Sequence, residues 1–113
     1  MTLALVFPGQ GSQSVGMLAE LAGEFPQVGQ TFAEASAVLG YDLWQLVQNG
    51  PESELQLTAV TQPAMLTAGV AVWRAWLAAG GPMPAVMAGH SLGEYTALVF
   101  AGALSFAQAV RLV

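Results

Sequence analysis

Cysteine and lysine are both missing from this sequence of 113 residues, and histidine occurs once, as His90. Without cysteine the chain can form no disulfide framework and no thiolate metal site, and one histidine among scattered acids makes no metal cluster. Two basic residues, Arg74 and Arg111, stand against seven acidic ones, so this surface cannot neutralise a row of phosphates. We therefore expect no metal site, no cofactor and no nucleic acid partner.

Targeting and membrane signals are also missing. Residues 1–7 have no basic start and run directly into Pro8 and Gly9, unlike a signal peptide. The uncharged stretch 75–93 contains glycines, prolines and His90, which would interrupt a spanning helix. Because 55% of the residues are apolar, the chain can bury a core of its own. We expect a cytoplasmic protein without a membrane partner.

Short apolar runs alternate with longer helical patterns, which predicts an α/β fold. Residues 3–7 and 85–88 are each typical of a strand in a buried parallel sheet. Helices are expected around 17–22, over 26–39, over 43–48, and over 92–100, the last apolar on all sides and therefore buried. Asp42 is expected to cap the third of these helices, and a capping box at Ser105 starts a further one.

The longest helix is expected to begin at Thr61 or Gln62, with Pro63 in its first turn, and to end at Gly80. Trp73 and Trp76 follow the period of this helix, which favours packing in the core and at its rim over a ligand site.

Residues 89–93 read Gly-His-Ser-Leu-Gly, a G-x-S-x-G pattern between a predicted strand and a predicted helix. A nucleophile at the apex of a sharp turn leaves no room for Cβ atoms two residues before and after it, so glycine flanks the serine. The backbone N–H of Leu92 would lie at the positive end of the following helix, where an oxyanion could form. The pattern predicts Ser91 as a nucleophile.

Two other interpretations of this stretch remain open. Ser91 and Glu94 also fit an S-x-x-E capping box, in which the serine would only cap a helix. His90 invites the role of general base, but neighbouring side chains on an extended segment point in opposite directions, which favours a structural role.

The loop after the first strand, residues 8–13, is rich in glycine. Gly9 and Gly11 approach the dinucleotide pattern G-x-G-x-x-G, but Ser14 stands in place of the third glycine. The acid expected about 20 residues further on would be Glu34, which lies in a helical pattern instead of at a strand end. A nucleotide site is therefore a weak alternative for this loop.

Three motifs in order, residues 7–13 (Phe-Pro-Gly-Gln-Gly-Ser-Gln), 61–64 (Thr-Gln-Pro-Ala) and 89–95 (Gly-His-Ser-Leu-Gly-Glu-Tyr), carry a family resemblance. With them the chain resembles the malonyl-CoA:acyl carrier protein transacylases of bacterial fatty acid synthesis. The related acyltransferase domains of polyketide synthases share these motifs. The final helix, which runs to Val113 without a terminating residue, adds the expectation that the chain is the N-terminal part of a truncated, hydrolase-like α/β core.

The resemblance implies that Ser91 accepts a malonyl group from malonyl-CoA as an ester and passes it to the phosphopantetheine thiol of acyl carrier protein. It implies backbone N–H groups of Gln10 and Leu92 as the oxyanion hole, and Gln62 near the pocket. The general base, a histidine, and the arginine that holds the malonyl carboxylate would lie beyond this chain, as would a small inserted subdomain. The 113 residues alone are therefore expected to be inactive.

Two rival functions remain. An esterase or thioesterase of the α/β-hydrolase type shares the serine turn but does not need the motif of residues 9–13 directly after its first strand. A non-catalytic fragment or interaction module is the other alternative for the chain as it stands.

Overall fold

The computed structural model describes residues 4–7, 13–81, 86–89 and 93–113. Its two strands are β1 (Ala4–Phe7) and β2 (Val86–Gly89). The described helices are α1 (Ala19–Glu24), α2 (Pro26–Leu39), α3 (Leu43–Asn49), α4 (Glu52–Leu55), α5 (Thr58–Ala78), α6 (Gly93–Phe100) and α7 (Phe106–Leu112).

The strands β1 and β2 pair in parallel, with Ala4 opposite Val86 and Phe7 opposite Gly89. Helices α1 to α5 form the connection between them, which is the crossover that a parallel pair requires. The α/β class predicted from the sequence is therefore confirmed, and both strands lie within a residue of their predicted positions.

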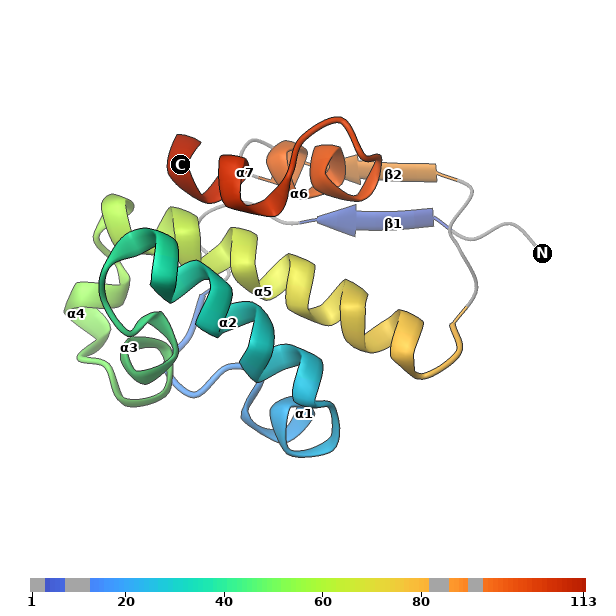
Figure 1. The fold of residues 1–113 in the computed structure, drawn as a ribbon. Coiled ribbons are helices and arrows are strands. Elements are labelled where there is room, and N and C mark those ends of the chain that lie inside the picture. Colours follow the sequence, from blue (N-terminus) through green and yellow to red (C-terminus); the bar gives the residue numbers. More distant parts are fainter. Residues whose placement is uncertain (1–3, 8–12, 82–85, 90–92) are drawn as a thin grey trace.

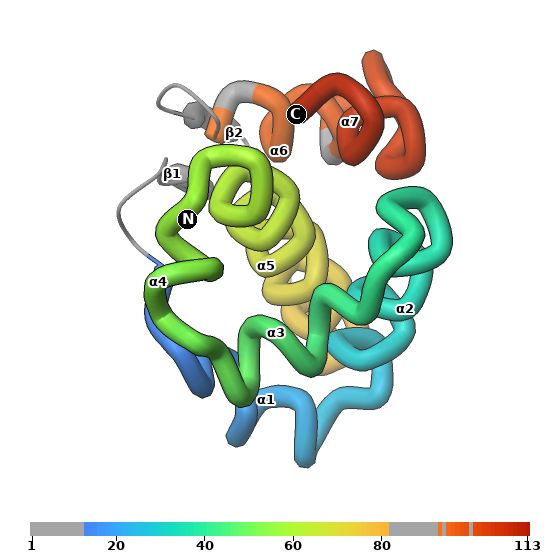
Figure 2. Tube along the Cα trace, turned by 90° about the vertical axis from the view of Figure 1, so that its left-hand side faces the viewer, coloured from blue at the N-terminus to red at the C-terminus, as the bar shows by residue number. Residues whose placement is uncertain are grey.

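Helix α5 is the centre of the helical layer (Figure 2), and α2, α4, α6 and α7 all contact it. In Figure 1 it runs opposite to the strands, so its N-terminal end lies on the side to which both strands point. Its buried residues include Leu66 and Val70, which join Val28 and Phe32 of α2 in one hydrophobic core. Trp73 is buried and Trp76 is 40% exposed, which confirms core and rim packing.

The predicted start of α5 was wrong, because the helix begins at Thr58, and Pro63 lies beyond its first turn. A proline inside a helix removes the hydrogen bond from its own nitrogen to the carbonyl four residues earlier. That carbonyl belongs to Ala59, an exposed residue, so water can replace the missing bond.

The predicted N-terminal caps of α3 and α7 are confirmed, whereas α1 begins and ends two residues later than predicted. Asp42 accepts a hydrogen bond from the Gln45 N–H at 3.0 Å and so caps α3. Ser105 and Gln108 exchange the two bonds of a capping box at the start of α7. The short helix α4 was not predicted, and Leu55 in it is fully buried.

Helix α6 is not buried on all sides, contrary to the prediction from its composition. Thr96 is buried, but Tyr95 is 37% and Leu98 is 44% exposed. The helix packs against both strands, α5 and α7, and these contacts leave Tyr95 and Leu98 exposed. Within the described ranges, no helix combines the length and the apolar character needed to cross a membrane.

Candidate active site

The carboxyl ends of β1 and β2 lie next to each other, because Phe7 is the parallel partner of Gly89. In the sequence Gln10 follows Phe7 by three residues, and Ser91 follows Gly89 by two. Two segments from opposite ends of the chain therefore start from adjacent points at one edge of the sheet. In α/β folds this edge is where ligand sites are built. Gln10, His90, Ser91 and Leu92 themselves lie outside the described residues.

The elements on either side of the predicted serine turn are those that a nucleophile elbow requires. Strand β2 ends at Gly89 and helix α6 begins at Gly93, so three residues connect strand to helix. Helix α6 then packs back on both strands and on α5. A strand joined to a helix by so short a connection is the structural context in which a G-x-S-x-G sequence indicates a nucleophile elbow.

Gln62 lies in the second turn of α5 and is half-buried. The N-terminal end of this helix is on the side to which the strands point (Figure 1). The neighbouring Thr61 is fully buried, and its hydroxyl donates to the Leu55 carbonyl, which joins α5 to α4. Gln62 is thus on the same side of the molecule as the carboxyl ends of the strands.

Sequence reasoning missed the residues that hold the chain where it leaves the glycine-rich loop. The Gly16 N–H donates to the Val47 carbonyl oxygen at 2.8 Å. The Gln48 side-chain amide nitrogen donates to the Met17 carbonyl oxygen, also at 2.8 Å. Both partners are consecutive residues at the end of α3. A single glutamine has no sequence pattern that marks such a contact in advance.

The charged residues that the structure describes include one ion pair between two helices and several exposed surface groups. Arg74 forms an ion pair with Glu34 at 3.0 Å, so the acid that a dinucleotide site would have needed is engaged on α2 instead.

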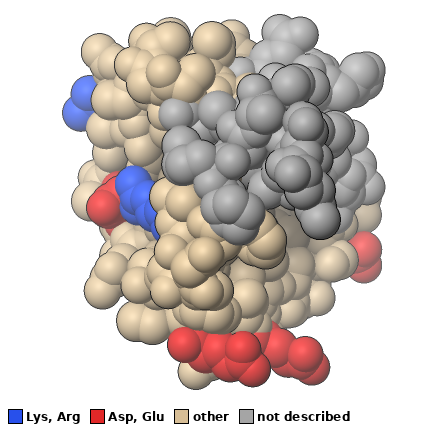
Figure 3. All heavy atoms as spheres, turned by 90° about the vertical axis from the view of Figure 1, so that its right-hand side faces the viewer, with Lys and Arg blue, Asp and Glu red and all other residues tan. Residues whose placement is uncertain are grey.

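Acidic side chains gather at the end of the molecule where α1 lies (Figure 3), and Glu20 and Glu24 are exposed residues of that helix. Arg111 is an exposed residue of α7. In the described ranges no three potential metal ligands form a group.

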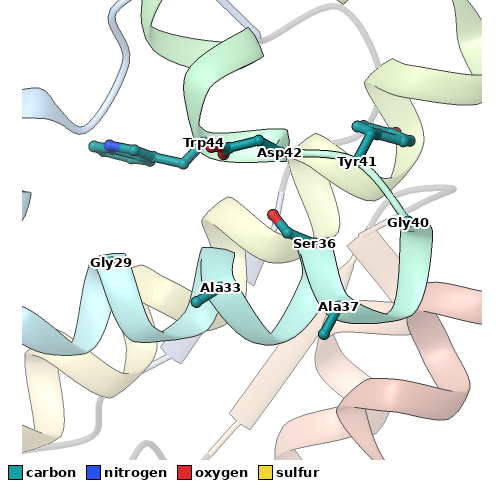
Figure 4. Close-up of a pocket in the computed structure, with 8 residues that line it drawn as sticks. All are labelled: Gly29, Ala33, Ser36, Ala37, Gly40, Tyr41, Asp42 and Trp44. Carbon is teal, nitrogen blue, oxygen red and sulfur yellow. The ribbon is translucent and has the colours of Figure 1, made fainter.

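A groove of about 580 Å³ lies between α2 and the start of α3. Figure 4 shows Gly29, Ala33 and Ala37 along α2, with Tyr41 and Trp44 across from them. Partial burial raises the pKa of the Tyr41 hydroxyl above its usual value, and a phenol is neutral at physiological pH in any case. The groove is formed by α2, α3 and the turn between them, and none of the predicted catalytic residues is among those that line it.

A comparison with known protein families identifies the family of this chain. The model of the acyl transferase domain matches residues 4–113. The chain belongs to the acyl transferase domain family. This confirms the resemblance that the three motifs carry, and the matched range contains all three motifs.

Relatives of known function within the acyl transferase family are close. The chain is 70% identical over 110 residues to the malonyl CoA-acyl carrier protein transacylase of Salmonella typhimurium, covering 97% of this chain. Its fold matches the crystal structure of an acyl carrier protein S-malonyltransferase from Vibrio cholerae with a TM-score of 0.97 and 63% identity, covering 100% of this chain and 37% of that one. A malonyl-transacylase in complex with a type II PKS acyl-carrier protein gives a TM-score of 0.96 and 66% identity, with coverages of 99% and 36%.

The chain spans about a third of the length of these relatives, 36% for the Salmonella typhimurium protein. The described residues therefore supply one part of an acyl transferase domain. They provide the strand ends from which two predicted catalytic segments leave, and the helices that support them.

Proposed function

We propose that the protein containing this chain transfers a malonyl group from malonyl-CoA to the phosphopantetheine thiol of acyl carrier protein, in the cytoplasm, as a step of fatty acid synthesis. Residues 1–113 would form the N-terminal part of its α/β acyltransferase domain. The remaining part of that domain would supply a general base, a cation for the malonyl carboxylate and a small inserted subdomain.

The reaction would proceed in two halves. The Ser91 hydroxyl oxygen attacks the thioester carbonyl while the base takes its proton, and coenzyme A leaves as the thiol when that proton is returned. The phosphopantetheine thiol then attacks the serine ester in the same way, and the hydroxyl is regenerated. In both halves the negative oxygen would be stabilised by the backbone N–H groups of Gln10 and Leu92. Gln62, at the N-terminal end of α5, would contact the bound substrate.

The pairing of Phe7 with Gly89 carries this proposal. Because of this pairing, the segment that contains Gln10 and the segment that contains Ser91 follow adjacent strand ends. An oxyanion donor and a nucleophile have to lie close together to act on one carbonyl. The nearby start of α6 at Gly93 supports a nucleophile elbow at Ser91. The names of the close relatives support malonyl as the acyl group and a carrier protein as its acceptor.

The test is acyl labelling of the full-length protein with radioactive malonyl-CoA. We expect one malonyl ester per molecule, on the peptide that contains Ser91, and transfer of the label to acyl carrier protein. Ser91→Ala should abolish both. Ser53→Ala is the matched control, because Ser53 is an exposed residue of α4 and its loss should leave labelling unchanged.

Two results would contradict the proposal. Label mapped to a peptide without Ser91 would remove the nucleophile assignment. Release of free malonate at the rate of label loss, with none passed to the carrier protein, would identify a thioesterase instead of a transferase.

A further inference from the structure

Residues 13–18 follow the loop that contains Gln10 and lie against the end of α3. Two hydrogen bonds of 2.8 Å join them to this helix, from the Gly16 N–H to the Val47 carbonyl and from the Gln48 side chain to the Met17 carbonyl. A Cβ placed on Gly50, just after α3, would be 3.4 Å from a methyl group of Val15, so this side chain also lies against the helix end. Three successive residues of the segment therefore contact α3 or the residue that follows it.

The backbone of this segment adopts conformations that require support. Gly16 has a φ of 86° and Leu18 a φ of 66°, both in the left-handed region. A leucine in this region is strained and persists only where its surroundings hold it. Leu18 packs partly buried against the core, and the carbonyl just before it, that of Met17, is held by Gln48. Apart from any made by Gln13, the bond from the Gln48 side-chain amide to the Met17 carbonyl is the one side-chain hydrogen bond that the structure describes for residues 13–18.

The helix that provides these contacts is itself firmly placed. Leu43 and Val47 are fully buried in the core. The Leu43 N–H donates to the Ser36 hydroxyl at 3.0 Å, and the Ser36 hydroxyl donates to the Phe32 carbonyl of α2. Helix α3 can therefore act as a fixed support for the segment that passes over it.

We propose that Gln48 is a positioning residue for the oxyanion hole. It holds the point where the glycine-rich loop returns to the scaffold, while the pairing of β1 with β2 holds the point where the loop leaves. The loop between these two points carries the Gln10 N–H. The inference rests on the proposed function, in which that N–H stabilises the reacting oxygen.

The substitution Gln48→Met keeps the length of the side chain and removes its amide donor. Because displacing a catalytic group by about 1 Å can cost about a hundredfold in rate, we expect kcat for malonyl transfer by the full-length protein to fall about tenfold or more. The KM for malonyl-CoA should change by less than about twofold. The interaction that is weakened, between the Gln10 N–H and the negative oxygen, is made in the transition state and not with the bound substrate. Gln45→Met is the matched control, because Gln45 is an exposed residue of the same helix.

A double-mutant cycle separates positioning from a general structural role. Gln10→Pro removes the backbone donor itself, so in that background Gln48→Met should lower kcat by less than about twofold. A residue that only stabilises the fold would cost the same factor in both backgrounds, and that result would overturn the proposal.

Amide hydrogen exchange gives a readout independent of activity. The Gly16 N–H and its neighbours in residues 13–18 should exchange faster in Gln48→Met than in Gln45→Met. Equal exchange in the two variants, or equal kcat, would overturn the role of Gln48. If Ser91→Ala remained active the proposed function would fail, and unequal exchange would then still show that Gln48 holds this segment.

Discussion

Arg74 joins three helices, and its replacement by methionine should destabilise the protein by more than the loss of one ion pair. The guanidinium of this α5 residue lies 3.0 Å from Glu34 Oε2 and donates to Thr31 Oγ1 at 3.0 Å, both on α2. It also lies 5.3 Å from the ring centroid of Phe106 on α7. Methionine retains an unbranched apolar stem but makes none of these three polar contacts.

The exposure of the partners decides which contact contributes most. The side chains of Arg74 and Glu34 are 34% and 56% exposed, so their ion pair contributes at most about 1 kcal/mol. The hydrogen bond to the fully buried Thr31 contributes about 1 kcal/mol. The contact with the Phe106 ring adds about 0.5–1 kcal/mol. The loss in unfolding free energy should therefore be about 1.5–3 kcal/mol, and most of it should persist at high salt.

Urea unfolding of the full-length protein measures this loss. Glu34→Gln removes the ion pair alone and should cost less than about 1 kcal/mol. Arg111→Met, at an exposed position of α7, should stay within about 0.5 kcal/mol of the parent. If Glu34→Gln cost as much as Arg74→Met, and 1 M salt removed the difference from the parent, the ion pair would dominate and the reasoning would be wrong.

Three other predictions follow from the same contacts and motifs. Gln10→Pro should lower turnover about 10²–10³-fold and Gln10→Ala much less, because only proline removes the backbone donor; equal losses in folded variants would assign the role to the side chain. Gly81→Ala should cost about 1–3 kcal/mol of stability, because its Cβ would overlap the Trp76 ring, and the cost should shrink in a Trp76→Leu background. Residues 1–113 alone should show no malonyl transfer above background, because the proposed base and the proposed cation for the malonyl carboxylate are absent from them; turnover abolished by Ser91→Ala would refute this.

Features that depend on neighbouring residues could be predicted from the sequence. Asp42 caps α3 and Ser105 caps α7 because each cap bonds to an N–H three residues away. Gly40 ends α2 with a φ of 84°, in the conformation that glycine adopts most easily. The start of α5 was misplaced because Pro63 favours a first turn, although a helix tolerates it further in when the orphaned carbonyl can reach water.

Features that depend on distant residues could not be predicted in this way. The exposure of Leu98 follows from which side of α6 meets the strands, and composition does not contain that information. The contact between Gln48 and Met17 joins residues 31 positions apart. For the candidate site, the motifs indicated Ser91 and Gln10, and the structure adds that the strands leading to them are partners. The catalytic roles of both residues stay predictions.

The pairing of Phe7 with Gly89 also sets the distance between the two strand ends at the carboxyl edge of the sheet. A shift of one residue would displace one strand end by about 3.3 Å and turn its side chains to the opposite face. Each strand has only four residues, so a short ladder must hold this alignment with help from α6, which packs on both strands and on α5. Substitutions of residues at the contact between α5 and α6 should therefore change the reaction rate as well as the stability of the protein.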